Sequence, residues 1–560
     1  MPATKPNPIL RIFPSLTDVA FLAPALLLFI RLDGVKTMLS DGDTGWHIRA
    51  GEWMLANGKV PMQDMFSFTK AGEPWYAWEW LADIILAVLH QRFGLAGPVT
   101  LGIFLLGIAS VLLFRLCRWH SSNDFFAIGV TAVAMAASSI HWLARPHLFT
   151  FVFIMITLHL LTRAETYPKV LWWIPVLVVP WVNLHGAFFV AIILLGMTAT
   201  GKFLTSITAP ETKGLREAID SAKPYVVVGA VAAAASLINP YGWNLHKHIY
   251  TYLTEKYHFE HIVEFQTLSF HAPVAVYFET LLFLGIIAAA WAIVNRRFSE
   301  SILLLGWLHL SLIAGRNIPI FAFVAAPIVC RFLSEALAIL KTAPVASWIQ
   351  RAAASVQSYG EEFALIDRVP RIHIVSALAS ILLFVAIDNA PIDSDKLRAE
   401  YDRKKYPSAA VMAKLEGHRV FTNDEWGDYL IYSLYPKTKV FVDGRSDFYG
   451  PEFSLRYLDV MDGHYEWATI LRKQNVDAIL LPAKATLTAT LKESAEWRVT
   501  YDDSISILFL ASGTADASAK PGGTASLASG RDASPAPKSG QLSEMADQPK
   551  PQPNIGHKAG

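Results

Sequence analysis

The feature that most constrains this chain is a run of apolar segments, separated by short polar breaks, from Leu16 to about Asp388. A helix that crosses the hydrocarbon core of a bilayer needs roughly 20 residues at a rise of about 1.5 Å per residue. The pattern therefore predicts a polytopic α-helical membrane protein with about eleven transmembrane helices. The predicted spans are 16–32, 95–114, 124–143, 147–162, 170–183, 187–203, 224–239, 276–294, 301–314, 317–332 and 372–388.

Three polar breaks inside this run leave the topology open. They lie at Arg145-Pro146, Leu184-His185 and Arg316-Asn317. The apolar segments on either side of each break form either a tight helical hairpin or one long broken helix.

Composition excludes several classes of protein. Hydrophobic residues make up 53% of the chain and charged residues 17%, against roughly a quarter charged in a soluble chain, so a soluble globular protein is excluded. A net charge of +1 offers no basic field for nucleic acid, and two cysteines exclude a disulfide scaffold. The chain contains no phosphate loop, no His-Glu-x-x-His and no Gly-x-Ser-x-Gly, which argues against nucleotide-driven pumping and zinc proteolysis.

The distribution of Lys and Arg predicts the orientation. These residues are denser in the loops on the amino-terminal side of the membrane than in the opposite loops, which indicates a cytoplasmic amino terminus. The first span has no small-x-small cleavage site and is followed by charged residues, as in a signal anchor.

The chain divides into four predicted parts. Residues 1–15 form the cytoplasmic amino terminus, and 16–394 form the transmembrane domain with a first outer loop at 33–94. Residues 395–511 form a periplasmic α/β domain. Residues 512–560 are rich in Ala, Gly, Ser, Pro and Lys and lack aromatic residues, which predicts a disordered tail.

Local signals predict elements within the outer loop and the α/β domain. A helix is expected from Thr44 to Ala56 with Asp43 as N-cap, stopped by Asn57-Gly58. An amphipathic segment at 79–93 either lies in the membrane interface or extends the second span. In the α/β domain we expect strands at 419–422, 439–442 and 478–481, helices at 426–435, 451–461 and 465–474, and a hairpin at 497–510.

Unusual polar residues gather at the span ends on the outer side. Ionisable groups at membrane depth are costly and usually face a cavity or a partner. Two arginines in otherwise apolar turns indicate a site for an anionic group, because guanidinium binds phosphate bidentately. The residues at these span ends are Asp41, Asp43, Glu79, Asp83, Arg145, His147, Asn183, His185, Asn239, Tyr241, Arg316 and Asn317.

Each of these residues also has a purely structural interpretation. Asp43 is then only an N-cap, the two arginines are snorkelling anchors, and the histidines and asparagines satisfy backbone groups at helix ends. Asp443-Gly444-Arg445 is then a turn with a local ion pair, and His159 and His309 are satisfied core residues. Asp41-Gly42-Asp43 also has the spacing of two oxygen ligands for a divalent cation.

The motifs resemble those of a known class. Asp41-Gly-Asp43-Thr-Gly-Trp-His47 in the first outer loop, about ten spans and an outer α/β domain resemble the GT-C class of integral membrane glycosyltransferases. Three further stretches are similar to a set of bacterial polytopic membrane proteins that are largely uncharacterised. They are Gly51–Gly58, Asp64–Thr69 and Trp78–Leu81, with Gly427–Leu430 and Val442–Arg445 in the outer domain.

The resemblance implies an enzyme that transfers a hexose or pentose from a polyprenyl-phosphate donor to a glycan, lipid or protein acceptor outside the cytoplasm, in a bacterial inner membrane. An acidic residue of the first outer loop serves that class as base or metal ligand, so Asp43 and Asp41 are the first candidates, with Mg²⁺ or Mn²⁺ as the possible cation. The first loop carries Asp-Gly-Asp instead of the Asp-Glu pair of protein O-mannosyltransferases. The outer domain is also shorter than in oligosaccharyltransferases, so the acceptor class does not carry over.

Residue chemistry then assigns the remaining roles. Arginine, histidine and asparagine side chains would bind the donor phosphate, and a glutamate with a histidine would position the acceptor. The donor-binding residues are Arg145, His147, Arg316, Asn317 and His185, and the acceptor-positioning residues are Glu79 and His47. Two other functions stay open, namely a transporter or flippase for a lipid-linked glycan, and a non-catalytic scaffold whose outer domain binds a partner.

Overall fold

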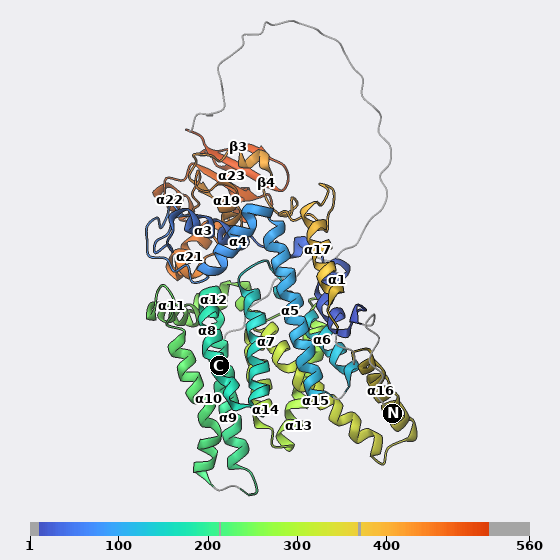
Figure 1. Cartoon of the computed structure of the whole chain (residues 1–560). Helices are drawn as coiled ribbons and strands as arrows, with labels where there is room; N and C mark the ends of the chain where they lie inside the picture. The colour runs from blue at the N-terminus through green and yellow to red at the C-terminus, as the bar shows by residue number, and fades with distance from the viewer. Residues whose placement is uncertain (1–10, 122, 212–213, 368–370, 514–560) are drawn as a thin grey trace, which may run out of the picture. The chain divides into compact units, whose positions relative to one another are not determined.

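The computed structural model describes residues 11–121, 123–211, 214–367 and 371–513. Helices follow one another through the first three quarters of the chain (Figure 1). They are α1 (Leu16–Arg31), α2 (Val35–Met38), α3 (Asp43–Asn57), α4 (Trp80–Phe93), α5 (Ala96–His120), α6 (Asp124–Ser138), η2 (Ser139–His141), α7 (His147–Ala164), η3 (Pro168–Trp172), α8 (Trp173–Leu184), η4 (Gly186–Phe188), α9 (Phe189–Ile207), α10 (Leu215–Ala235), α11 (Trp243–Thr254), α12 (Lys256–His261), η5 (Val263–Phe265), α13 (Ala275–Val294), α14 (Phe298–Ile313), η6 (Gly315–Asn317), α15 (Ile318–Thr342), α16 (Ser347–Ile366) and α17 (Ile374–Asp388).

Seven helical segments in the described part of the chain are long and apolar enough to cross a membrane. They are Ala96–His120, Asp124–His141, His147–Ala164, Gly186–Ile207, Leu215–Ala235, Ala275–Val294 and Gly315–Thr342, and three shorter apolar segments are Pro168–Leu184, Phe298–Ile313 and Ile374–Asp388. The chain is therefore a multi-pass membrane protein, while the count of about eleven spans stays a prediction.

Each of the three predicted breaks separates two helices. Pro146 precedes the first residue of α7, and the backbone is extended at His185 and at Ala314. An extended residue interrupts the helical hydrogen bonds, so the polar side chains beside each break are presented at helix ends.

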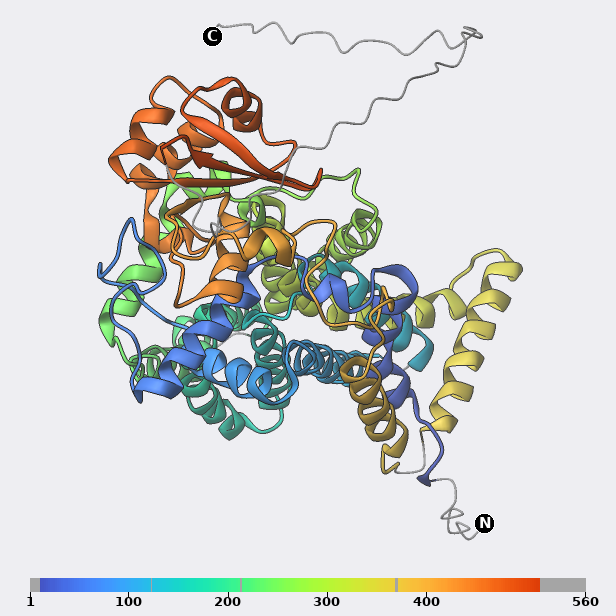
Figure 2. The same cartoon turned by 90° about the horizontal axis from the view of Figure 1, so that it is seen from above.

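The last part of the described chain contains a four-stranded sheet in the order β1-β2-β4-β3. Strand β1 is parallel to β2, and the other two neighbouring pairs are antiparallel (Figure 2, orange-red). The strands are β1 (Val420–Phe421), β2 (Ala478–Pro482), β3 (Trp497–Asp502) and β4 (Ser506–Ala511), and the helices are α18 (Ala409–Met412), α19 (Asp424–Leu434), α20 (Ser446–Tyr449), α21 (Pro451–Met461), α22 (Trp467–Lys473) and α23 (Thr486–Glu493). The strands predicted at 419–422 and 478–481 and the terminal hairpin are confirmed.

The prediction of a strand at 439–442 is wrong. Val440 forms only isolated bridges, to Val420 and to Ser67 of the outer loop. Its amide donates to the carbonyl of Phe66 at 3.1 Å, and its carbonyl accepts from the amide of Phe68 at 3.0 Å. The outer loop thus takes the hydrogen bonds that a longer strand would have used.

The described residues from 11 to 512 form one compact unit, in which helix α3 of the outer loop packs against α19 of the sheet region. The division at residue 395 stays a prediction, and the predicted tail lies outside the described residues from 514 onward.

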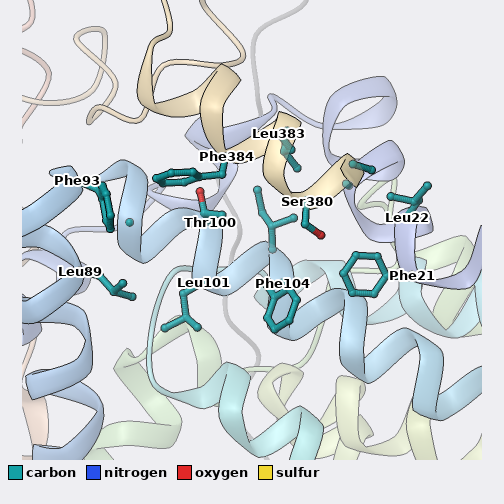
Figure 3. A pocket seen from close by; sticks show the side chains of 14 residues that line it. Phe21, Leu22, Leu89, Phe93, Thr100, Leu101, Phe104, Ser380, Leu383 and Phe384 are labelled. Carbon is teal, nitrogen blue, oxygen red and sulfur yellow. The ribbon is translucent and has the colours of Figure 1, made fainter. Parts of the chain in front are cut away.

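An apolar cavity of about 240 Å³ lies among α1, α4, α5 and α17 (Figure 3). Its walls are mainly Leu and Phe side chains such as Phe21, Phe93 and Phe384, with the hydroxyls of Thr100 and Ser380 as its polar side-chain groups. This lining suits hydrocarbon and offers no charged group for catalysis.

Candidate functional site

The centre of the candidate site is Arg145, which lies between η2 and α7. Its Nη1 donates to Asp41 Oδ2 at 2.8 Å and to Glu264 Oε1 at 3.0 Å, and its Nη2 lies 2.7 Å from Asp43 Oδ2. Only 19% of the Arg145 side chain is exposed. One guanidinium therefore serves three carboxylates in a largely enclosed place, which leaves an excess of negative charge. We call Asp41, Asp43, Arg145 and Glu264 the acidic cluster.

Asp43 is not an N-cap, contrary to one prediction. The N-cap of α3 is Gly42, and Asp43 is the first helical residue, with no side-chain bond to the amides of α3. Its carboxylate turns to Arg145 because that guanidinium satisfies it better than a backbone amide does. The predicted stop is confirmed, since Gly58 ends α3 with φ of 64°.

Asp41 is the least satisfied acid of the cluster. Its Oδ1 is buried and has no hydrogen-bond partner among the described residues. Burial, with Asp43 and Glu264 nearby, raises the pKa of Asp41 to about 7, although Arg145 opposes the shift. Burial acts in the same direction on Glu264, but Arg145, His141 and Arg316 outweigh it and lower that pKa to about 2. The acids of one cluster thus differ in protonation near neutral pH.

A second set of groups surrounds Glu79, next to α4. His185 Nε2 lies 3.2 Å from Glu79 Oε1, and His47 Nε2 lies 3.5 Å from Glu79 Oε2. His185 Nδ1 accepts from the amide of Ala187, so the ring proton sits on Nε2 and points to Glu79. His47 Nδ1 lies 2.7 Å from Asp83 Oδ1. Burial raises the pKa of Glu79 to about 8 and lowers that of His47.

Arg316 differs from Arg145 because no carboxylate pairs with it among the described residues. Its Nη1 donates to the hydroxyl of Tyr252 at 3.3 Å, and its guanidinium lies over the ring of Phe265 at 4.6 Å. Phe265 directly follows Glu264 of the acidic cluster. Arg316 is therefore a half-buried cation, held in place by Tyr252 and Phe265, with N–H donors left for an anion.

Three of the polar residues predicted at span ends use their side chains for hydrogen bonds to other groups of the protein. His147 Nε2 donates to the carbonyl of His141 at 2.7 Å, and Asn317 donates to the carbonyl of Leu310 at 3.0 Å. Asn183 donates to two carbonyls and accepts from the indole of Trp80. The helix-end interpretation therefore accounts for the contacts of these three side chains.

Asp428 of α19 reaches the acidic cluster from the sheet region. It lies in the stretch Gly427–Leu430 that carries the resemblance, but it was not predicted as a site residue. Asp428 and Asp43 share a side-chain hydrogen bond, and Asp428 Oδ1 accepts from the amide of Gly444 at 2.8 Å. A Cβ on Gly444 would lie 2.5 Å from Asp43 Oδ1, and one on Gly42 would lie 2.7 Å from the Asp428 Cβ. Two glycines thus permit the approach of these carboxyl groups, because any side chain there would separate them.

Asp443 and Arg445 form the local ion pair that the sequence allowed. Arg445 Nε donates to Asp443 Oδ1 at 2.7 Å. Arg445 Nη2 also donates to Asp64 Oδ1 at 2.7 Å, which ties the outer loop to the sheet region. This buried triad holds the Gly444 backbone beside the acidic cluster.

The acidic cluster does not fit a divalent cation. Within the described ranges no group of three or more His, Cys, Asp and Glu side chains is arranged to hold a metal ion. The guanidinium of Arg145 binds both Asp41 and Asp43 and takes the place that a cation between them would need.

Comparisons with known proteins identify the fold. No protein-family model and no curated protein matches the chain. The structure is similar to the crystal structure of the Archaeoglobus fulgidus oligosaccharyltransferase in its apo form, with a TM-score of 0.50 and 10% identity over 84% of this chain and 69% of that chain. The same enzyme tethered to an acceptor peptide gives a TM-score of 0.50 and 11% identity over the same shares. The chain therefore has a polytopic membrane fold similar to that of an oligosaccharyltransferase, as the GT-C resemblance implies.

Proposed function

We propose that the protein is an integral membrane glycosyltransferase, which moves a sugar from a polyprenyl-phosphate donor to an acceptor hydroxyl on the side of the membrane where residues 395–511 lie. By the predicted orientation this side is the periplasm of a bacterium. The observation that carries the proposal is the half-buried Asp41 carboxylate, whose buried Oδ1 has no partner among the described residues while its Oδ2 is bound to Arg145. The fold similar to an oligosaccharyltransferase supports it.

The chemistry needs a base for the acceptor. As the acceptor oxygen attacks the anomeric carbon, its O–H proton passes to a carboxylate and the bond from that carbon to the phosphate oxygen breaks. Asp41 suits the base because its Oδ1 makes no hydrogen bond among the described residues, while Asp43 fixes Arg145 and contacts Asp428. The electron pair of the broken bond leaves on the lipid phosphate.

The leaving phosphate needs positive charge. Arg145 is occupied by three carboxylates, whereas Arg316 has donors left, so Arg316 is the principal phosphate ligand in this proposal. His185 and His47 hold Glu79, which positions the acceptor. No step requires a metal ion, because the acidic cluster does not fit one.

The test is transfer of a radiolabelled sugar from synthetic polyprenyl-phosphate donors by the full-length protein in liposomes. We expect Asp41→Asn to slow transfer about 10²- to 10⁴-fold, the usual contribution of a general base, and Asp43→Asn to slow it as well because Asp43 holds Arg145. Asp33→Asn is the matched control, since Asp33 is an exposed acid of the same loop.

The result also separates the other functions. Donor binding without turnover, unchanged by either substitution, would favour a transporter. No donor binding at all would favour a scaffold. Equal turnover by wild type and Asp41→Asn would refute the assignment of the base.

A further inference from the structure

A second cavity, of about 680 Å³, lies between the segment 399–410, helix α19 and the turn before α5. We propose that this cavity binds a carbohydrate, and that under the proposed function this carbohydrate is the acceptor. The binding inference stands on the cavity alone, and only the acceptor role rests on the proposed function. The volume falls within the roughly 300–1,000 Å³ of cavities that enclose small ligands.

Four tyrosines form one wall of the cavity. Tyr401 and Tyr406 are buried and Tyr429 and Tyr432 are half-buried. The ring of Tyr401 contacts the other three rings, with centroids 4.9 to 5.4 Å apart. Tyrosine gives a large, rigid contact surface at a low cost in side-chain entropy. The half-buried rings of Tyr429 and Tyr432 are the faces that remain for stacking against the C–H face of a sugar ring, while the buried rings of Tyr401 and Tyr406 support them.

The tyrosine hydroxyls hold this wall in place. The Tyr406 hydroxyl donates to Glu425 Oε1 at 3.0 Å, and the Tyr432 hydroxyl lies 3.1 Å from His90 Nε2. Because these bonds fix the rings before a ligand arrives, little ordering is required on binding.

Charged groups at the rim suit sugar hydroxyls. Glu400 accepts from Arg403 at 3.1 Å, and both residues line the cavity. A carboxylate beside a guanidinium offers acceptors and forked donors, which pair with neighbouring hydroxyls of a sugar. A peptide that binds by strand addition would need a sheet edge, and none of the cavity's lining residues comes from β1 or β3. The lining therefore favours carbohydrate over peptide.

The cavity adjoins the loop that carries the proposed base. The Tyr401 hydroxyl donates to the carbonyl of Gly42 at 3.3 Å, and Lys405 Nζ donates to the carbonyl of Ser40. These carbonyls lie on either side of Asp41 in the chain. Leu95 lines the cavity directly before the membrane-spanning helix α5, so the cavity opens beside the point where that helix begins. A glycan held there lies beside both the membrane and the acidic cluster.

The experiment is binding of the full-length protein in detergent to an array of oligosaccharides of two to six mannose, glucose, galactose or N-acetylglucosamine units, with short peptides on the same array. We expect at least one oligosaccharide to bind, and Tyr429→Ala to weaken its binding by about tenfold or more. Tyr429→Phe should stay within about twofold, because it keeps the aromatic face. Tyr465→Ala is the control, since that tyrosine is fully exposed and does not line the cavity.

A second variant covers the case in which Tyr429→Ala does not fold. Ala410→Trp places a large ring on an exposed residue of the lining, so it should block binding with the unfolding temperature unchanged. Binding of no oligosaccharide, binding of peptides alone, or oligosaccharide binding unchanged by Tyr429→Ala and Ala410→Trp would each overturn the inference. The wild-type protein could also bind an oligosaccharide, lose that binding in both variants, and yet transfer no sugar. This result would reject the proposed function and support the inference that the cavity binds carbohydrate.

Discussion

The two ends of the membrane helices both carry partly buried charge, but they balance it differently. Near the sheet region, one guanidinium serves Asp41, Asp43 and Glu264. At the opposite ends of α13 to α15, two arginines face two glutamates. Arg297 binds Glu335 through two bonds of 2.7 and 2.8 Å, and Arg331 binds Glu300. We call these four residues, Arg297, Glu300, Arg331 and Glu335, the balanced cluster.

The difference separates two uses of buried charge. Paired charges offset much of the free energy that their loss of hydration costs, so a matched set is compatible with a purely structural role. An excess of acid has no such compensation and is typical of a functional site. The acidic cluster, in which the pKa of Asp41 is about 7, has this second pattern, and the pKa of the neighbouring Glu79 is raised to about 8.

The largest expected difference concerns the arginines of the two clusters. Arg145→Lys should slow sugar transfer by about 100-fold or more, because the compact ammonium lacks the planar fork whose two separate nitrogens reach Asp41 and Asp43. Arg297→Lys keeps a charge in the balanced cluster and should change transfer by less than about twofold. Initial rates of transfer per folded molecule measure both effects, and equal losses would remove the distinction between the clusters.

Thermal stability should depend more on the balanced cluster than on the acidic cluster, which is the opposite of the order expected for sugar transfer. Glu300→Gln leaves Arg331 without its carboxylate and should cost about 1–3 kcal/mol, seen as an unfolding midpoint lower by a few degrees. Asp41→Asn removes excess negative charge and should not lower that midpoint. Thermal unfolding in detergent tests the pair, and a drop for Asp41→Asn as large as that for Glu300→Gln would show that the acidic cluster is structural.

The pH dependence of stability should carry the signature of Glu79. Its pKa rises from 4.5 to about 8 on burial, so the folded state holds the proton more tightly than the unfolded state does. This contribution is complete below about pH 4.5 and is lost as the pH rises through about 8. The unfolding midpoint should therefore fall between pH 5 and 9, and Glu79→Gln, which mimics the protonated acid, should flatten the fall. An identical slope in the variant would contradict the shift.

Divalent cations should have the smallest effect. Because Arg145 lies between the two aspartates, addition of Mg²⁺ or Mn²⁺, or of EDTA, should change transfer by less than about twofold. Strict dependence on a cation would mean that Arg145 leaves this position in the active state.

The residues of this site that could be predicted from the sequence are those that stand out from their apolar neighbours. Arg145, Glu79 and the aspartates of the outer loop interrupt apolar segments or flank them, and the structure brings them to the same helix ends. Glu264 and Asp428 carry no such mark. Glu264 follows short helices in a polar stretch, and Asp428 lies on an amphipathic helix, so only the tertiary structure brings them to the cluster.

The two wrong predictions, of Asp43 as an N-cap and of a strand at 439–442, failed because residues distant in sequence supply the partners of these groups. Asp43 has the position of an N-cap, but Arg145, distant in sequence, binds its carboxylate. Val440 has the apolar neighbours of a strand residue, but the outer loop takes its hydrogen bonds. Local propensity predicted the elements of the sheet region and could not predict which distant partner each polar group would meet.

The most direct test of the central claim is an experimental structure of the protein with polyprenyl phosphate bound in a lipid nanodisc. We predict that the phosphate lies within hydrogen-bonding distance of Arg316, on the side of the acidic cluster. A phosphate bound at the balanced cluster, or a carrier bound with its phosphate away from both arginines, would contradict it.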